Sequence, residues 1–277
     1  MINFFNYIER ESPVHRLTGA TKLICLILYS TAGMITFDTR MLFCLAILSF
    51  VLLRKANLRY KDISFVFNFT LFFMVFNNIM IFLFSPRYGT QIYGTEHLLF
   101  GMTGRYALTA EQLFYHLNQI LKYFSMVPIV LLFVCTTNPS EFAASLNRIH
   151  VPYSVDYSVA LALRYIPDIQ REYHDISLAQ QARGIEMSKK ESLFKRLKSA
   201  SAILIPLILS SIDRLEVISN AMELRGFGKK STRSWYMARP FERNDYLAIT
   251  LCALLIAAAI ALNILNGGRF WNPFISR

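Results

Sequence analysis

Residues 63–84 read ISFVFNFTLFFMVFNNIMIFLF and contain no Asp, Glu, Lys, Arg or His. A second uncharged block, YLAITLCALLIAAAIALNIL, covers residues 246–265. A helix needs about 20 predominantly apolar residues to cross the hydrocarbon core of a bilayer. Both blocks are long enough, so each is predicted to span a membrane. The composition agrees, because 54% of the 277 residues are hydrophobic and 17% are charged, whereas soluble domains average roughly 45–50% and 25%.

Three further apolar stretches are predicted to be helical spans: residues 23–37, 41–53 and 112–135. Only residues 38–40 separate the first two, so these are expected to form a tight helical hairpin, although the second is short for a full crossing. Lys122 and Pro128 interrupt the third stretch. We assign Lys122 no role, because polar residues precede it and the helix there is expected to lie partly in protein or at the external interface.

The positions of Lys and Arg predict the orientation in the membrane. Four cations lie between the second and third spans: Arg54, Lys55, Arg59 and Lys61. In the 85–111 loop, by contrast, two Arg are balanced by two Glu. Cytosolic loops of membrane proteins carry the excess of Lys and Arg. The N-terminus and residues 136–244 are therefore expected in the cytosol, and the 85–111 loop and the C-terminus outside, in a multi-pass protein of the cell membrane.

Three segments follow from this count. Residues 1–135 hold transmembrane helices 1–4, residues 136–244 form a cytosolic domain, and residues 245–277 hold the last span and an external C-terminus. The cytosolic segment contains 16 of the 29 Lys and Arg, so the net charge of +11 is read as positive-inside charge rather than nucleic-acid binding. No cleavable signal is expected before Leu23, because that region is charged. The four scattered cysteines suggest neither a metal site nor a disulfide framework.

Two long amphipathic helices are predicted in the cytosolic segment, over about residues 158–184 and 193–226. In the second, apolar residues recur at spacings of three, four, three and seven, which places them on one stripe of a helix. The stripe consists of Ile205, Ile208, Ile212, Leu215 and Met222. The uncharged core of this helix, residues 199–212, is too short to span a bilayer. The helix is therefore expected to lie along the membrane or against the spans. The predicted fold class is an all-α membrane protein with about five transmembrane helices plus these two.

The two cytosolic helices end alike. SLAQQARG covers residues 177–184 and SNAMELRG covers residues 219–226, with Ser, Ala, Arg and Gly at identical offsets. Gly just past a helix adopts the left-handed cap conformation at little cost, and Arg complements the negative end of the helix dipole. One such ending is an ordinary cap. Two in matched context predict a paired device, because an Arg at a blunt helix end can form bidentate bonds with carboxylates of a partner.

At these residues the chain resembles the transmembrane (T) component of energy-coupling-factor (ECF) transporters, the EcfT/CbiQ family. Members have two coupling helices that each end in an Ala-Arg-Gly-type triplet. Here the first triplet, Ala182-Arg183-Gly184, matches fully, and the second, Leu224-Arg225-Gly226, departs at its first position. Residues 136–142 through 151–152 are similar to the family's linker into the first coupling helix. Near the N-terminus, residues 18–20 read Thr-Gly-Ala where members commonly have Asp-Pro-Arg.

The resemblance implies a subunit without catalysis. Two cytosolic ECF ATPases, identical or different, would grip the two Arg-bearing helix ends, and the apolar stripe would dock a substrate-binding membrane protein, the S component. The same stripe could instead pack against the chain's own spans. ATP and Mg would be bound by the partner subunits, so no cofactor is expected in this chain. The transported substrate would be a vitamin or a transition-metal ion, and the sequence does not say which.

Two other classes of membrane protein are alternatives to a transporter subunit. An intramembrane enzyme needs paired acids, a metal cluster or a nucleophile with its base inside the spans. The sequence has no HExxH, no GxSxG and no paired membrane Asp, and its five histidines are scattered. A solute carrier working alone needs polar or broken helices at the membrane midplane. Asn68, Asn77 and Asn78 are the candidates there, and hydrogen bonding between helices explains them equally well.

Overall fold

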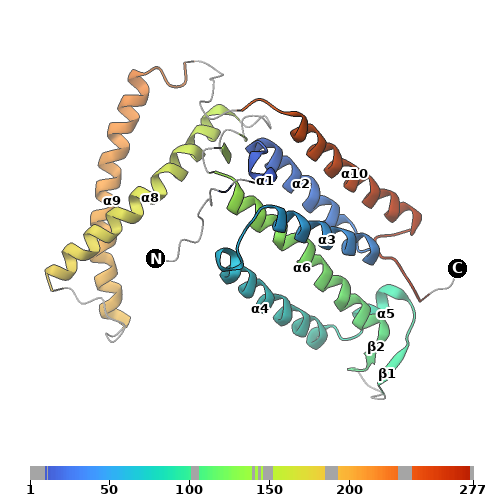
Figure 1. Cartoon of the computed structure of the whole chain (residues 1–277). Helices are drawn as coiled ribbons and strands as arrows, with labels where there is room; N and C mark the ends of the chain where they lie inside the picture. Colours follow the sequence, from blue (N-terminus) through green and yellow to red (C-terminus); the bar gives the residue numbers. More distant parts are fainter. Residues whose placement is uncertain are drawn as a thin grey trace. The chain divides into compact units, whose positions relative to one another are not determined.

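The computed structural model describes residues 10, 12–100, 106–138, 141–142, 145, 152–184, 193–229 and 239–274. Two compact units make up the chain: Met1–Asn138 with Arg239–Arg277, and Pro139–Ala238. Helices dominate both units (Figure 1). The sheet that is described consists of two short antiparallel strands, β1 (Leu98–Phe100) and β2 (Leu108–Thr109). The predicted class, an all-α membrane protein, is confirmed.

The five predicted spans correspond to five helices of the first unit: α2 (Gly19–Ile35), α3 (Thr39–Lys55), α4 (Tyr60–Phe84), α6 (Ala110–Thr136) and α10 (Arg243–Leu265). Three segments are long and apolar enough to cross a membrane, namely Ile63–Phe84 in α4, all of α6 and all of α10. Helices α2 and α3 have 17 residues each. At 1.5 Å per residue this gives about 26 Å, slightly less than the roughly 30 Å of hydrocarbon in a bilayer. Two short helices, α1 (Pro13–Arg16) and α5 (Tyr88–Tyr93), complete the unit.

Asp38 begins α3 and also ties this helix to the end of α10. Its carboxylate accepts a bond from the backbone N–H of Arg40 at 2.9 Å, as a helix N-cap, and another from Asn266 Nδ2 at 2.8 Å. The Arg40 guanidinium lies 2.9 Å from the same group. Burial alone would raise the pKa of the Asp38 carboxyl, but these hydrogen bonds from Arg40 and Asn266 outweigh burial and lower the pKa below its ordinary value. The ionised carboxylate is thus part of the folded unit.

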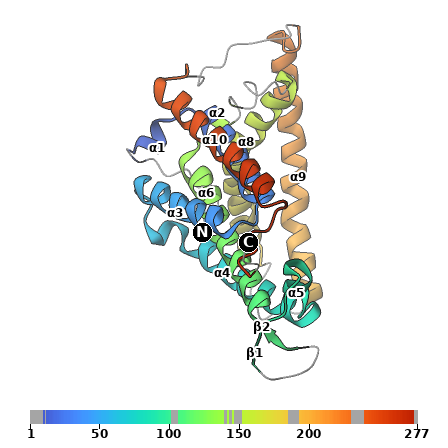
Figure 2. The ribbon, with the colours of Figure 1, turned by 90° about the vertical axis from the view of Figure 1, so that its right-hand side faces the viewer.

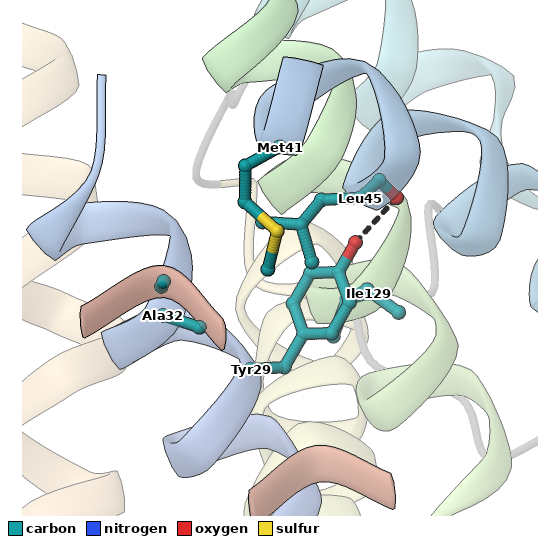
Figure 3. Close-up of a cluster of buried hydrophobic side chains, with 6 residues drawn as sticks. Tyr29, Ala32, Met41, Leu45 and Ile129 are labelled. Carbon is teal, nitrogen blue, oxygen red and sulfur yellow. Dashed lines mark hydrogen bonds between the residues drawn. The ribbon is translucent and has the colours of Figure 1, made fainter. Parts of the chain in front are cut away.

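The predicted tight hairpin of α2 and α3 is not what forms. Helix α2 packs chiefly along α10, and α3 packs chiefly along α6. At the start of α2, Asp245 of α10 accepts the backbone N–H of Thr18 at 3.0 Å, which fixes the first of these pairs. The three-residue link is long enough for the two helices to diverge toward different partners. They meet through side chains, where the Tyr29 hydroxyl donates to the Leu45 carbonyl at 2.5 Å (Figure 3).

The core of the first unit surrounds this contact. Tyr29 and Ala32 of α2 lie against Met41 and Leu45 of α3, and Ile129 of α6 closes the cluster (Figure 3). All five residues are at most 7% exposed. Lipid is as apolar as these side chains, so in a membrane their close van der Waals packing, rather than removal from water, holds the three helices together at the point where α2 and α3 diverge.

Pro128 lies inside α6 without ending it, so the predicted span over residues 112–135 forms a single helix. Proline removes the hydrogen bond to the carbonyl four residues earlier, which here belongs to Phe124. The hydroxyl of Ser49 on α3 lies 3.0 Å from that carbonyl and 2.8 Å from the Ala46 carbonyl of its own helix, so it can donate to the freed group. A proline is tolerated in a membrane helix when a neighbouring side chain satisfies the freed carbonyl. Helix α6 therefore runs continuously through Pro128.

Lys122 of α6 contacts α2 and the residues that follow it. Its ammonium donates to the Met34 carbonyl at 3.3 Å and lies 3.6 Å from the centre of the Phe37 ring. A carbonyl and an aromatic face are both favourable surroundings for a cation. These contacts explain how a Lys is accommodated within an apolar span without assigning it a function.

The second unit consists mainly of two long helices, α8 (Tyr153–Ala182) and α9 (Leu193–Leu224). They are about 45 and 48 Å long at 1.5 Å per residue and cross each other (Figure 1). Helix α8 begins five residues before the predicted residue 158, directly after Pro152, whose fixed φ suits a helix start. The start of α9 agrees with the prediction. Both helices are seen from a second direction in Figure 2.

Contacts at both ends show that α8 and α9 run antiparallel. Near the end of α8, Gln180 Nε2 donates to the Ala202 carbonyl near the start of α9 at 3.1 Å. That carbonyl is the one freed by Pro206, four residues later in α9. At the other end, the Phe227 ring, just past α9, lies 5.3 Å from the Tyr153 ring at the start of α8. The endings of the two helices therefore lie at opposite ends of the pair.

Candidate functional site

Helix α8 ends with Arg183 as its C-cap residue. The Arg183 N–H bonds to the carbonyls of Ala179 and Gln180 at 3.2 and 3.1 Å, and the Gly184 N–H bonds to the Gln181 carbonyl at 2.9 Å. Gly184 has a φ of +83°, in the left-handed region. A Cβ added there would meet no atom within 4 Å. Backbone conformation rather than lack of space therefore explains why Gly follows Arg at this end.

Helix α9 ends in the same way. Gly226 has a φ of +68°, and its N–H bonds to the Glu223 carbonyl at 2.9 Å. The next N–H, of Phe227, bonds back to the Met222 carbonyl at 2.9 Å. These two bonds make up the Schellman motif, which satisfies carbonyls at the end of a helix. The predicted Gly caps are thus confirmed at both ends, with each Arg one residue beyond the last helical residue rather than in the last turn.

Each ending exposes its Arg. Arg183 and Arg225 are both exposed, as are Ala182 and Leu224 beside them. The Leu224 side chain is 89% exposed, so the position at which the second triplet departs from Ala presents a large apolar surface. A guanidinium at such a position can bind a carboxylate through two parallel N–H bonds. The structure thus brings together the residues of each predicted triplet, and places the two triplets at opposite ends of the α8–α9 pair.

The predicted apolar stripe of α9 faces away from α8. Ile205, Ile208, Ile212 and Leu215 are 54–58% exposed, and Met222 is half-buried. The face of α9 that packs on α8 carries Ile203 and Leu207 instead, at 0% and 8% exposure. Exposed apolar surface of this extent marks an interaction site or a membrane-facing surface. Packing against α8 does not account for the stripe.

Sequence reasoning missed the inner face of α9. Ile203, Leu207, Ser210 and Arg214 follow one another at spacings of four, three and four, which is a helical face. The signal was present, but Ser210 and Arg214 interrupt the apolar pattern and so conceal it. The aromatic residue after the second Arg-Gly pair, Phe227, was also missed, and its ring packs on both Tyr153 and Tyr157.

Most of the polar residues that could serve another function bond to other residues of the chain. Asn68 accepts from the Tyr60 hydroxyl at 2.9 Å, and Asn78 is 2.8 Å from His116 Nδ1. The Asn77 side-chain oxygen is buried without a hydrogen-bond partner. His97 lies 2.6 Å from the Glu111 carboxylate. His150 falls outside the described residues, and within these no three His, Cys, Asp or Glu side chains gather as a metal-ion site.

Comparison with known proteins gives the family. A family model described as CbiQ, cobalt transport protein, matches residues 10–235. The chain belongs to the EcfT/CbiQ family of transporter membrane components. The matched residues include α8, α9 and both Arg-Gly ends, and α10 lies beyond them.

Curated relatives agree with the assignment to the EcfT/CbiQ family. The energy-coupling factor transporter transmembrane protein EcfT of Bacillus selenitireducens is 26% identical over 278 residues, which cover 94% of this chain and 97% of the relative. EcfT of Streptococcus equi subsp. equi is 29% identical over 259 residues, covering 90% and 92%. EcfT of Staphylococcus aureus is 29% identical over 154 residues, covering 53% and 56%. The family predicted from the two Arg-Gly ends is therefore confirmed.

Proposed function

We propose that this chain is the coupling subunit of an ATP-driven ECF-type importer. In this proposal two ECF ATPase subunits bind the α8 and α9 endings, and their ATP-driven closure moves the two helices. Hydrolysis takes place in the partners, which bind ATP and Mg, while this chain contributes no catalytic group. The observation that carries the proposal is the pair of matching Gly-capped helix ends, each with an exposed Arg.

The chemistry of each ending fits an acidic groove on an ATPase. Arg183 and Arg225 would each form bidentate, charge-assisted bonds with carboxylates, which are stronger than bonds between neutral groups. Ala182 and Leu224 would add apolar contact around them. Because the Gly at each end lets the backbone turn away at once, the helix presents a blunt end that a groove can enclose. Two such ends match a dimer of ATPases, whether its subunits are identical or different.

The exposed stripe of α9 is proposed as the docking surface for a substrate-binding S component. Its residues are apolar, face away from α8 and extend over about five turns, which suits packing against membrane helices. The S component would recognise the vitamin or transition-metal ion, and movement of α9 would reorient it to release this substrate inside. Lipid covers whatever apolar surface of the spans remains free of protein.

Reversal of both Arg charges tests the proposal. Arg183→Glu with Arg225→Glu should abolish co-purification of the ATPases and uptake, because Glu repels the carboxylates that the Arg would bind, while the protein still inserts in the membrane. Arg171→Glu is the matched control, since Arg171 lies on α8 with a side chain 77% exposed. This variant should still co-purify with the ATPases and support uptake. Normal ATPase binding in the double variant would refute the proposal.

The stripe has its own test. Ile208→Asp with Ile212→Asp should release the S component from the purified complex and leave the ATPases bound, because the change places charge in a packed apolar surface. Val217→Asp is the control: Val217 is also on α9 and 69% exposed, but lies off the stripe. The S component is identified as the membrane protein that co-purifies from native membranes. Its retention in the double variant would exclude the stripe as the docking surface.

The orientation is proposed from the positive-inside rule, with the N-terminus and the α8–α9 unit in the cytosol and the C-terminus outside. In a variant without the four native cysteines, a membrane-impermeant thiol reagent added to intact cells should label Glu96→Cys. Asp175→Cys on α8 should react only after the cells are opened. Both residues are exposed, so access through the protein does not limit either reaction. The opposite labelling pattern would overturn the orientation.

A further inference from the structure

One polar cluster joins α8 to α9 away from the helix ends. The Glu172 carboxylate of α8 accepts a bond from the Ser210 hydroxyl at 2.5 Å through one oxygen, and from Arg214 Nη2 at 2.6 Å through the other. Ser210 and Arg214 lie one turn apart on α9. Both carboxylate oxygens are therefore held by the opposite helix. The side chains of Glu172 and Arg214 are 21% and 36% exposed, so the ion pair is partly shielded from water.

Apart from the bond from Gln180 Nε2 to the Ala202 carbonyl near the end of α8, the rest of the contact between α8 and α9 is less directional. Ile203 and Leu207 are buried, but apolar burial is non-directional and by itself specifies the register of two helices less sharply than hydrogen bonds do. Hydrogen bonds weaken steeply when their angles depart from linear. Two charge-assisted bonds to one carboxylate therefore fix both the register and the relative rotation of the helices at this point.

The position of the cluster divides each helix into arms. From Glu172 to the end of α8 at Ala182 is about 15 Å, and from Ser210 to the end of α9 at Leu224 is about 21 Å, at 1.5 Å per residue. Because the helices run antiparallel, these two arms extend in opposite directions. Each arm carries one Arg-Gly ending. A change of the crossing angle would thus move the two endings relative to each other.

We propose that Glu172, Ser210 and Arg214 are positioning residues: their contact, the α8–α9 clamp, fixes how the two helices cross, so that displacement of one Arg-Gly ending is carried to the other. The inference rests on the proposed function for its role in transport. Its structural part stands independently, because it concerns only the distance between the endings. The clamp residues themselves need not touch the ATPases or the substrate.

A distance measurement tests the structural part. Spin labels at Leu178→Cys and Glu223→Cys, in the full chain without its native cysteines and held in lipid nanodiscs, report the distance between the endings. The native clamp should give a narrow distribution, and Glu172→Ala should broaden and shift it by several ångströms. The charge swap, Glu172→Arg with Arg214→Glu, should narrow it again. Asp168→Ala is the matched control, since Asp168 pairs with Arg171 of its own helix at 2.5 Å, and should change nothing.

Several results would contradict the proposal that the α8–α9 clamp fixes the helix crossing. An unchanged distribution in Glu172→Ala would do so, as would broadening that the charge swap does not reverse. If Glu172→Ala fails to accumulate in the membrane, Ser210→Ala replaces it. That variant loses one of the two bonds and should show partial broadening, and a distribution identical to the native one would equally overturn the proposal.

A transport measurement tests the role in coupling. In the complete complex reconstituted in vesicles, Glu172→Ala should retain its ATPases but import substrate about tenfold more slowly, because the loss of both charge-assisted bonds weakens the coupling between the two endings. The charge swap should restore uptake. Loss of ATPase binding in Glu172→Ala would contradict a positioning role. If instead the Arg183 and Arg225 reversals leave ATPase binding intact, the proposed function fails while the distance result remains valid.

Discussion

Replacement of Gly184 separates the conformation of a helix ending from its charge. Gly184 has a φ of +83°, and an added Cβ would meet nothing within 4 Å. Gly184→Ala therefore changes only the backbone energy. The left-handed conformation costs an L-residue about 1–2 kcal/mol, while loss of glycine flexibility in the unfolded chain returns about 0.4–1 kcal/mol. The net destabilisation of the cap is about 1 kcal/mol.

This magnitude predicts an effect on partner binding. If ATPase binding requires the capped ending, its affinity falls with the capped population, so 1 kcal/mol corresponds to a loss of up to about fivefold. Asn tolerates the left-handed region and Val does not. Affinity should therefore decrease in the order Gly, Asn, Ala, Val at position 184. In the assay, purified ATPase is titrated onto the protein in nanodiscs, and binding is measured as a change in fluorescence.

Two controls make the Gly184 prediction specific. Gly268→Ala also adds a Cβ where nothing lies within 4 Å, but at a residue without a positive φ, and should bind ATPase normally. Replacing Gly184 and Gly226 together should multiply the two losses, because the sites are far apart. If Asn at position 184 binds as weakly as Val, or if Val binds as well as Gly, the capped ending is not what the ATPase recognises.

Two further predictions concern the membrane unit. Ser49→Ala should lower the free energy of unfolding by about 1 kcal/mol, the typical net value of a hydrogen bond, because the Phe124 carbonyl freed by Pro128 loses a donor. Ser30→Ala is the control and should not lower it, because the Ser30 hydroxyl bonds within its own helix. Asp38→Asn keeps the N-cap and removes the charge. The pKa of Asp38 is lower in the folded state than its ordinary value of 3.8. The ionised carboxylate therefore contributes to stability at pH values above 3.8, and this contribution is lost as the pH falls through the pKa of the folded state. The native protein should thus lose more thermal stability in acid than Asp38→Asn, and equal losses in the two proteins would exclude this contribution of the carboxylate.

The spans and the capped endings could be predicted from the sequence because both depend on local residues. An uncharged block such as residues 63–84 has few stable places outside a membrane, and a Gly after a helix has a strong preference for one conformation. The family resemblance used these same local features. The residues of each triplet are therefore found where the sequence placed them.

The errors concern contacts between helices that are distant in the chain. A short link at residues 38–40 does not reveal that α2 will pair with α10, more than 200 residues away. Nor does Pro128 reveal that Ser49 lies beside the carbonyl it frees. The inner face of α9 was hidden for a related reason, since Ser210 and Arg214 become intelligible only when Glu172 is placed opposite them. Local pattern specifies each helix, and tertiary contact decides which faces meet.

Pro128 and Pro206 share a feature that bears on how the protein is made. The side chain beside each freed carbonyl, Ser49 for the first and Gln180 for the second, comes from a helix earlier in the chain. Synthesis proceeds from the N-terminus, so α3 exists before α6, and α8 before α9. Each helix with a missing backbone bond is therefore produced after the helix that can supply the donor. During synthesis, the residue that can donate to each of these carbonyls is therefore already present when the carbonyl is made.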